Sequence, residues 1–286
     1  ATFDSFKGID IALFAGGSIS KDFAPHAVKA GAVVIDNSSA FRMDPEVPLV
    51  VPEVNPQAIL KHKGIIANPN CSTIIMVMAL KPIYDLAKIK RVIVSTYQAV
   101  SGAGKEGIDE LDAQVREHSE GREMTANILP SSSAEKHYPI AFNLIPQIDV
   151  FCDNLYTKEE MKMVNETKKI MEDYEMRITA TTIRVPVYRS HSESVNIELE
   201  KEVDLGAMRE ALAKFPGVTV QDDPSKQEYP MPLYTSEKDD VYVGRLRRDE
   251  SCEKSYNMWV VGDQIRKGAA LNTLQIAETM IKNGWI

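Results

Sequence analysis

The stretch Ile9-Asp10-Ile11-Ala12-Leu13-Phe14-Ala15-Gly16-Gly17-Ser18 decides the fold class, because it is a short apolar run that ends in a turn of small residues. The run predicts a strand over 9–14, and the segment from Lys21 to Ala30 predicts a helix after it. Further strands are predicted over 32–36, 49–53 and 64–67. Strands joined by helical crossovers form a parallel, doubly wound sheet, so we predict an α/β protein that starts with a partial Rossmann-like lobe.

Three loops follow these predicted strands. They are Gly16-Gly17-Ser18, Asn37-Ser38-Ser39 and Asn68-Pro69-Asn70-Cys71. Doubly wound sheets hold ligands at the carboxyl ends of their strands. We therefore expect the three loops to meet at one edge of the sheet and to line a binding site.

After Cys71 the pattern changes to longer strands and helices. Strands are predicted over 91–97, 178–187 and 191–200, and helices over 105–118 and 157–176. This combination predicts an α+β second lobe with a mixed sheet. The apolar positions of a last helix over 268–283 suit packing on the first lobe, so we divide the chain into residues 1–69 with 267–286 and residues 70–266.

Cys71 stands where a loop gives way to a long apolar run, in Asn68-Pro69-Asn70-Cys71-Ser72-Thr73. Pro69 disfavours helix for the residue before it and Asn70 is a candidate N-cap, so a helix is predicted to begin here. A helix N-terminus stabilises a thiolate and can lower the cysteine pKa by about one unit or several. Cys71 is therefore a candidate nucleophile, and the alternative is a small buried apolar residue.

Charge and cysteine content exclude several classes of protein. The 286 residues carry a net charge of −8, which argues against general nucleic-acid binding. Cys71, Cys152 and Cys252 are too far apart in sequence for closely spaced metal ligands or a disulfide framework, so no metal site is expected. No apolar stretch approaches the roughly 18–20 residues of a membrane span, and nothing at the N-terminus reads as a signal peptide. We expect a cytoplasmic protein without a membrane partner.

Residues 102–107, Gly102-Ala103-Gly104-Lys105-Glu106-Gly107, match the dinucleotide fingerprint G-x-G-x-x-G. In that fingerprint a second strand ends in an acidic residue about 20 positions later, and no such strand is evident here. We therefore interpret the segment as a flexible glycine loop that faces an active site, with the true fingerprint as the alternative.

One charged pair and one single arginine cannot be assigned to a site from their local sequence alone. Glu159 and Lys162 lie three residues apart at the start of a helix that Thr157 and Glu160 cap, and alone they fit a solvated ion pair. Arg42 alone fits either an anion clamp or a surface arginine.

Arg184 and His191 are stronger candidates for a site. Arg184 ends a predicted strand, and its guanidinium could hold a carboxylate or phosphate bidentately. His191 follows a turn and titrates near neutrality, so it is a candidate general acid or base.

Five motifs closely resemble those of bacterial aspartate-semialdehyde dehydrogenases and occur in that family's order. They are Asn37-Ser38-Ser39-Ala40-Phe41-Arg42-Met43-Asp44, Val51-Pro52-Glu53-Val54-Asn55, Asn68-Pro69-Asn70-Cys71-Ser72-Thr73, Gln98-Ala99-Val100-Ser101-Gly102-Ala103-Gly104, and Arg184-Val185-Pro186-Val187 with His191-Ser192-Glu193. The resemblance implies reductive dephosphorylation of L-aspartyl-4-phosphate to L-aspartate 4-semialdehyde, in the biosynthesis of lysine, threonine, methionine and diaminopimelate.

The resemblance also implies a role for each residue. Cys71 would carry a thioacyl intermediate, with His191 as acid/base partner and Gln98 orienting the carbonyl. The Asn70 side chain and the Cys71 N–H would stabilise the oxyanion. The substrate's α-carboxylate and α-amino group would be held by Arg184 and Glu159, and its phosphate by Arg42 and Lys162.

The implied cofactor is NADP, with NADPH as hydride donor. The residues assigned to it are Gly16, Gly17, Ser18, Asn37, Ser38, Ser101, Gly102 and Gly104, the last three against the nicotinamide. Residues 70–266 would form a catalytic and dimerisation domain, so the implied assembly is a homodimer, with a monomer as the alternative.

The family begins with a strand, a Gly-rich turn and a helix that cradle the cofactor pyrophosphate, and a βαβ unit takes about 30 residues or more. Only eight residues precede Ile9 in this chain. We therefore expect cofactor binding, and the choice of NADP over NAD, to depend on that leading segment.

Three alternatives stand beside this prediction. Glu159 as an ammonium partner argues against an N-acetyl-glutamyl-phosphate reductase or a malonyl-CoA reductase. Glyceraldehyde-3-phosphate dehydrogenases share the Cys–His chemistry but differ around the cysteine. The third is a non-catalytic paralogue acting as an interaction protein, against which Cys71, Gln98, Arg184 and His191 together argue.

Overall fold

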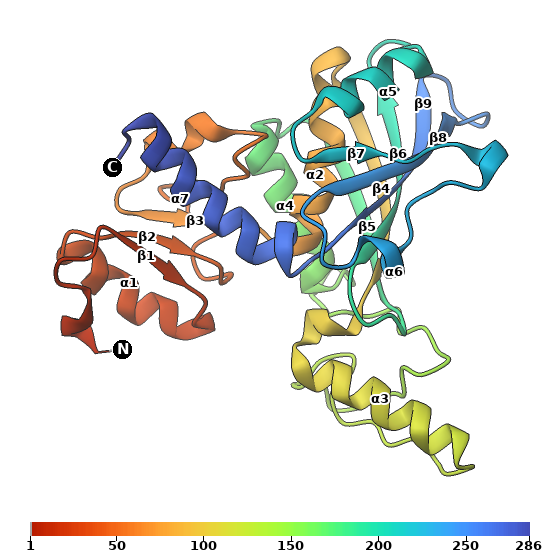
Figure 1. The fold of residues 1–286 in the computed structure, drawn as a ribbon, viewed down its shortest axis with the longest axis horizontal. Coiled ribbons are helices and arrows are strands. Elements are labelled where there is room, and N and C mark those ends of the chain that lie inside the picture. The colour runs from red at the N-terminus through yellow and green to blue at the C-terminus, as the bar shows by residue number, and fades with distance from the viewer. Residues whose placement is uncertain (1) are drawn as a thin grey trace.

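The computed structural model describes residues 2–286, which fold into two lobes, each built on its own sheet. The first lobe holds a three-stranded sheet of order β1-β2-β3, and the second a six-stranded sheet of order β5-β4-β6-β9-β8-β7. Helices α2 (Cys71–Leu86) and α4 (Lys158–Met171) lie between the two sheets (Figure 1).

The first lobe is doubly wound, as the sequence predicts. Its strands β1 (Ile11–Phe14), β2 (Val33–Asp36) and β3 (Ile65–Ala67) pair in parallel. Helices α1 (Ser20–Lys29) and α7 (Leu271–Asn283) cover opposite faces of the sheet (Figure 1). The first packs on Ala12 and Val34, and the second on Ile35 and Ile66, so alternate strand residues serve two separate cores.

The strand predicted over 49–53 does not form, because only Leu49 makes a bridge, to Ala67. Pro48 and Pro52 flank the segment, and proline has no N–H to donate to a ladder. The Asn55 side chain takes over this pairing. It accepts from the Val51 N–H at 2.9 Å and donates to the Leu49 carbonyl at 2.9 Å.

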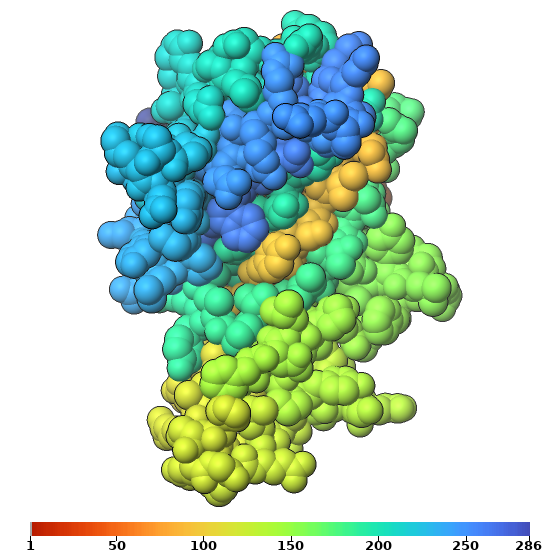
Figure 2. Space-filling view, turned by 90° about the vertical axis from the view of Figure 1, so that its right-hand side faces the viewer, coloured from red at the N-terminus to blue at the C-terminus, as the bar shows by residue number. Residues whose placement is uncertain are grey.

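The second lobe has the predicted mixed sheet. Its strands are β4 (Ile89–Gln98), β5 (Arg177–Arg184), β6 (His191–Leu199), β7 (Val218–Val220), β8 (Val241–Arg248) and β9 (Ser255–Gly262). Two neighbouring pairs are parallel, β4 with β5 and β7 with β8, and the others are antiparallel. Helices α2 and α5 (Leu205–Lys214) pack on one face. The other face, with β4, β6 and β9 side by side, forms part of the molecular surface (Figure 2).

Helix α3 (Lys105–Ser119) and the segment after it project away from both sheets, and α6 (Pro232–Thr235) is a single turn beside β9 (Figure 1). Helix α2 is apolar nearly all round because its side chains are buried in the largest core. Within residues 2–286, none of the helices combines the length and the apolar character needed to cross a bilayer.

Three predicted boundaries are wrong by a few residues. Helix α4 starts after Thr157, whose capping box forms as predicted, but it ends at Met171 rather than 176 because Glu172 is left-handed with φ 51°. Strand β5 ends at Arg184, two residues before Pro186. The last helix is preceded by a π-helical turn, Arg266–Ala270, so α7 itself begins at Leu271.

Candidate active site

A cleft of about 450 Å³ lies between the two lobes at the carboxyl ends of β1 and β2. Eight of the predicted site residues line it: Gly17, Asn37, Ser38, Arg42, Asn70, Cys71, Ser101 and Gly102. The three loops that the sequence places after strands therefore do meet, and the glycine loop after β4 closes the same cleft.

Cys71 is the first residue of α2. Asn70 is the N-cap, and its side-chain oxygen accepts from the Thr73 N–H at 3.2 Å. Gly268 packs directly on the nucleophile candidate, since a Cβ there would lie 3.0 Å from the Cys71 Cβ. The backbone at 268 can approach this closely only because it carries no side chain.

The expectation of a lowered pKa at Cys71 is wrong for this structure. Burial, and then the carboxylate of Glu159, raise the pKa of the half-buried Cys71 thiol to about 12. Arg42, Arg184 and the Ser72 N–H act in the opposite direction but do not outweigh the burial. The resting group is a thiol, so attack on a carbonyl carbon requires that its proton leave.

His191 lies buried against the glycine loop. Its Nδ1 accepts a hydrogen bond of 3.0 Å from the Ala99 N–H. In a neutral imidazole one nitrogen accepts and the other donates, so the proton is on Nε2. Nε2 has no partner among residues 2–286 and lies beside Gly102, where a Cβ would come within 3.3 Å. Burial, and then Arg184, hold the pKa of His191 well below its usual value, so the ring is a neutral donor.

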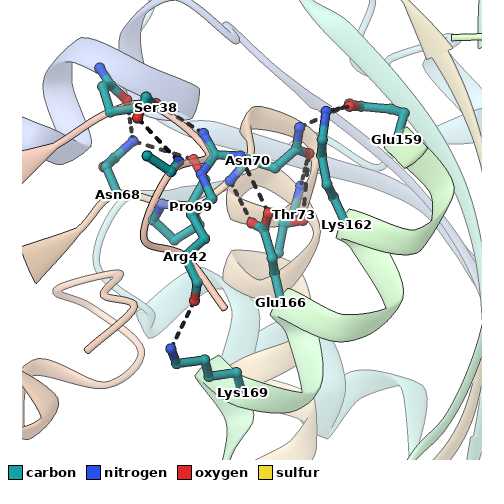
Figure 3. Close-up of polar contacts among 12 residues, drawn as sticks. Ser38, Arg42, Asn68, Pro69, Asn70, Thr73, Glu159, Lys162, Glu166 and Lys169 are labelled. Atoms are coloured by element: carbon teal, nitrogen blue, oxygen red, sulfur yellow. Dashed lines mark hydrogen bonds and ion pairs between the residues drawn. The ribbon is translucent and has the colours of Figure 1, made fainter. Parts of the chain in front are cut away.

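One face of α4 carries Glu159, Lys162, Glu166 and Lys169 toward the loops at the cleft (Figure 3). Glu159 accepts from the Asn70 amide at 2.9 Å, from the Gln98 amide at 3.3 Å and from the Lys162 ammonium at 3.1 Å. Burial opposes ionisation, but Lys162 and Asn70 together lower the pKa of Glu159. Glu159 and Lys162 thus belong to a hydrogen-bonded network at the cleft. The alternative of a solvated ion pair does not hold.

Both predicted arginine clamps are buried. Arg184 is 3% exposed and donates from Nη1 to the Ala99 carbonyl at 2.7 Å. Arg42 is 9% exposed and lines the cleft, which excludes a surface arginine. Its Nη2 donates to the Asn37 carbonyl at 2.9 Å, and its Nη1 donates to Glu166 at 3.3 Å.

The predicted cofactor residues are only partly brought together. Gly17, Asn37, Ser38, Ser101 and Gly102 line the cleft, whereas Gly16, Ser18 and Gly104 do not. The dinucleotide fingerprint over 102–107 is not supported by its surroundings, because the next strand, β5, begins only at Arg177. Gly107 serves packing instead, since a Cβ there would lie 2.5 Å from the Val100 carbonyl oxygen.

Sequence reasoning missed three contributors. Gln264 lines the cleft, donates to the Ser101 hydroxyl and accepts from the Ser190 N–H at 2.8 Å. Gly268 lies against Cys71, and Glu166 joins Arg42 to Asn70. The helical spacing of 159, 162, 166 and 169 is the signal that could have found Glu166. Across residues 2–286, no group of three or more His, Cys, Asp or Glu side chains is placed to hold a metal ion.

Two family models match the chain. Residues 1–62 match the one described as semialdehyde dehydrogenase, NAD binding domain, and residues 80–267 match semialdehyde dehydrogenase, dimerisation domain. An aspartate-semialdehyde dehydrogenase of Aquifex aeolicus is 58% identical over 286 residues, which cover 99% of this chain and 82% of that relative. The chain belongs to the aspartate-semialdehyde dehydrogenase family.

Solved aspartate-semialdehyde dehydrogenases share the fold. Aspartate semialdehyde dehydrogenase II of Vibrio cholerae, complexed with ASA, has a TM-score of 0.91 and 47% identity over 97% of this chain and 81% of that one. The enzyme of Candida albicans with NADP has a TM-score of 0.73 and 25% identity over 97% of this chain and 78% of that one. The predicted family and α/β fold class are confirmed, and the chain is an oxidoreductase that acts on an aldehyde. An interaction protein without catalysis is therefore not favoured.

Proposed function

We propose that this chain reduces L-aspartyl-4-phosphate to L-aspartate 4-semialdehyde through a thioester on Cys71. The observation that carries the proposal is the position of Cys71 at the start of α2, in a cleft that Arg42 and Asn70 also line. Family membership supplies the reaction class, and the cleft supplies the groups that the reaction needs.

In the first half-reaction the Cys71 sulfur attacks the acyl carbon. A C–S bond forms, the bond from carbon to the phosphate oxygen breaks, and phosphate leaves with the proton of the thiol. The Cys71 N–H and the Asn70 amide are placed to stabilise the oxyanion. Gln98 orients the carbonyl, and its amide is already fixed by Glu159 at 3.3 Å.

In the second half-reaction the thioester carbon is reduced and the C–S bond breaks, which returns the thiol and releases the aldehyde. The nicotinamide cofactor, when bound, supplies the hydride. His191 donates a hydrogen bond to the developing alkoxide, because its Nε2–H is unpartnered within residues 2–286. The carbonyl re-forms as the sulfur leaves, and the sulfur takes up a proton from solvent.

Charged residues on both sides of Cys71 position the substrate. We assign the substrate's α-carboxylate to the cationic Arg184 and its α-ammonium to the anionic Glu159. Both side chains are buried. We assign phosphate to Arg42 and Lys162. Arg42 lines the cleft, and Lys162 lies 3.1 Å from Glu159.

We propose that the cleft holds the part of the cofactor that carries the nicotinamide. Gly17 follows a parallel strand with φ 62°, and a Cβ there would meet nothing within 4 Å. Small residues at 15, 17, 102, 268 and 269 leave room for a flat ring close to Cys71. We propose NADP, held by Gly17, Asn37 and Ser38, with the nicotinamide against Ser101 and Gly102. The match to an NAD binding domain and the NADP complex of the Candida albicans enzyme support this choice.

We propose a homodimer formed by the second lobe. The support is the match of residues 80–267 to a dimerisation domain and the outward face of the six-stranded sheet (Figure 2). Tyr97 and Trp259 pair their rings on that face at 5.5 Å and are only half-buried. The same proposal divides the chain into residues 1–69 with 267–286 and residues 70–266.

We also propose a cytoplasmic enzyme that does not bind membranes. The net charge of −8 argues against nucleic-acid binding.

The test is phosphate-dependent reduction of NADP by aspartate semialdehyde. Cys71→Ala should abolish turnover, and Cys71→Ser should leave only a trace, because serine is a poorer nucleophile at neutral pH. Cys152→Ala and Cys252→Ala are the controls and should keep full activity. A Cys71→Ala variant with a tenth of the wild-type rate would refute the proposal.

A further inference from the structure

Glu166 is a buried carboxylate in contact with Arg42 of the proposed phosphate clamp, and neither family motifs nor the proposed chemistry assign it a role. It is 1% exposed, and both of its oxygens are occupied. Oε1 accepts from Nη1 of Arg42 at 3.3 Å, and Oε2 accepts from the Asn70 N–H at 2.6 Å (Figure 3). One side chain thus joins a cleft-lining arginine to the backbone immediately before Cys71.

Helix α4 holds the Arg42 segment at a second point. The Lys169 ammonium donates to three carbonyls, those of Arg42 at 2.8 Å, Asp44 at 2.7 Å and Val47 at 2.8 Å. Lys169 lies one turn after Glu166 on the same face of the helix. Helix α4 therefore fixes the backbone of Arg42 through one residue and its guanidinium through the other.

The hold on the guanidinium leaves it able to bind an anion. A guanidinium has five N–H donors, and Arg42 uses two, one to Asn37 and one to Glu166. Its Nε has no partner among residues 2–286. The contact with Glu166 is a single hydrogen bond rather than a bidentate pair, so the other donors stay free for phosphate oxygens.

We propose that Glu166 is a positioning residue that orients the Arg42 guanidinium for phosphate and locks it to the start of α2. The inference rests on the proposed phosphate-binding role of Arg42. The direction in which phosphate binding changes on loss of Glu166 distinguishes positioning from competition. If Glu166 merely competed with phosphate for Arg42, its loss would strengthen phosphate binding. As a positioning residue, its loss weakens phosphate binding although a negative charge has been removed.

Glu166→Gln is the informative change, because it keeps the shape of the side chain. Arg42 and Asn70 donate to different oxygens of Glu166, and glutamine replaces one of these oxygens with an NH₂ group that cannot accept, so one of the two contacts must break. We expect the KM for phosphate to rise by about tenfold, the scale of one charge-assisted hydrogen bond. The KM for the semialdehyde should change by less than about twofold, because Arg184 keeps its own contacts.

Arg42→Leu and the double variant distinguish the phosphate-binding role of Arg42 from the positioning role of Glu166. In the Arg42→Leu background, Glu166→Gln should add less than about twofold to the phosphate KM, because its route of action is gone. Additive effects, an unchanged or lowered phosphate KM in Glu166→Gln, or an equal rise in the semialdehyde KM would each overturn the inference. An unchanged phosphate KM in Arg42→Leu would overturn the phosphate assignment and the inference with it.

Glu160→Gln is the matched control. Glu160 is a neighbour on α4, is also buried, and accepts backbone N–H groups of Thr157 at 2.7 Å and Thr182 at 3.0 Å, but it does not contact Arg42. It should lower the Tm with the phosphate KM unchanged. If Glu166→Gln turns over too slowly for kinetics, protection of Cys71 by phosphate against alkylation gives the same Kd comparison, with the same expected tenfold weakening.

Discussion

The Ala99 N–H donates a hydrogen bond of 3.0 Å to Nδ1 of His191, and this single contact fixes the protonation of the ring. Since Nδ1 accepts, Nε2 carries the proton and is a donor beside Gly102, which lines the cleft. His191 can accept a second proton only by giving up the bond to Ala99. The geometry therefore favours His191 as a hydrogen-bond donor to the reacting oxygen over His191 as the base that deprotonates Cys71.

Substitutions at His191 should follow donor capacity. His191→Ala should lower kcat by about 10²–10³, the usual range for loss of one hydrogen-bond donor to an oxyanion. His191→Gln retains an N–H donor of similar length and should keep at least tenfold more activity than the alanine variant. Steady-state kinetics at pH 7 provides the comparison, and equal rates for the two variants would contradict the donor role.

Alkylation of Cys71 should report its raised pKa. Because that pKa is about 12, the thiolate fraction rises about tenfold per pH unit well beyond neutrality. The rate of modification by iodoacetamide, followed on the peptide that contains Cys71, should keep rising between pH 7 and pH 10. A plateau below pH 9 would show a much more acidic thiol.

Glu159→Gln should move alkylation and turnover in opposite directions. The carboxylate of Glu159 raises the pKa of Cys71, so its neutralisation favours the thiolate and speeds modification at pH 8. Turnover should fall by tenfold or more, because the variant loses the proposed ammonium partner and the anchor of Lys162. Slower alkylation in Glu159→Gln would show that the charge does not act on Cys71.

Gly102→Ala should impair catalysis without unfolding the protein. A Cβ at 102 would lie 2.6 Å from Nη1 of Arg184 and 3.2 Å from Cε1 of His191, so both side chains must move. We expect kcat/KM to fall by about tenfold or more, since small displacements of positioning groups are costly. The Tm should stay within a few degrees of wild type, and a variant with normal kcat/KM would contradict the packing at this loop.

Glu193 should make the protein less stable as the pH rises. It is fully buried on β6, neither oxygen has a partner among residues 2–286, and burial raises its pKa well above the usual value. Between the unfolded pKa of about 4.3 and the raised pKa of the folded state, the folded protein binds more protons than the unfolded chain. The free energy of unfolding therefore falls as the pH rises through this range.

Glu193→Gln removes this titration. Glutamine has no proton to hold above the unfolded pKa, so the cost of keeping the buried carboxyl protonated at pH 8 disappears and the Tm at pH 8 should rise. The gain should shrink toward pH 4. Thermal unfolding of both proteins at the two pH values measures it, and a gain that is equal at both would contradict the raised pKa.

The sequence predicts an element well where local chemistry determines it. Pro69 and Asn70 set the start of α2, and Thr157 with Glu160 sets the start of α4. The end of α4 depends on a left-handed residue at Glu172, for which the charged stretch around it gives no signal. The apolar run at 49–53 fails as a strand because the Asn55 side chain satisfies its backbone.

The site is predicted less completely, because its contacts join distant segments. Glu166 contacts Arg42 across 124 positions and Asn70 across 96, so its role appears only when α4 packs against both loops. The pKa of Cys71 is likewise set by burial and by Glu159, neither of which a local motif contains. Motif order identifies the family, whereas these tertiary contacts set the electrostatics.

The central claim is that Cys71 carries the acyl group. The direct measurement is peptide mass spectrometry of the chain incubated with aspartate semialdehyde and NADP without phosphate, since oxidation then stops at the acyl-enzyme. The account predicts an acyl adduct on the peptide that contains Cys71, which added phosphate removes. An adduct on the peptides of Cys152 or Cys252, with the Cys71 peptide unmodified, would contradict it.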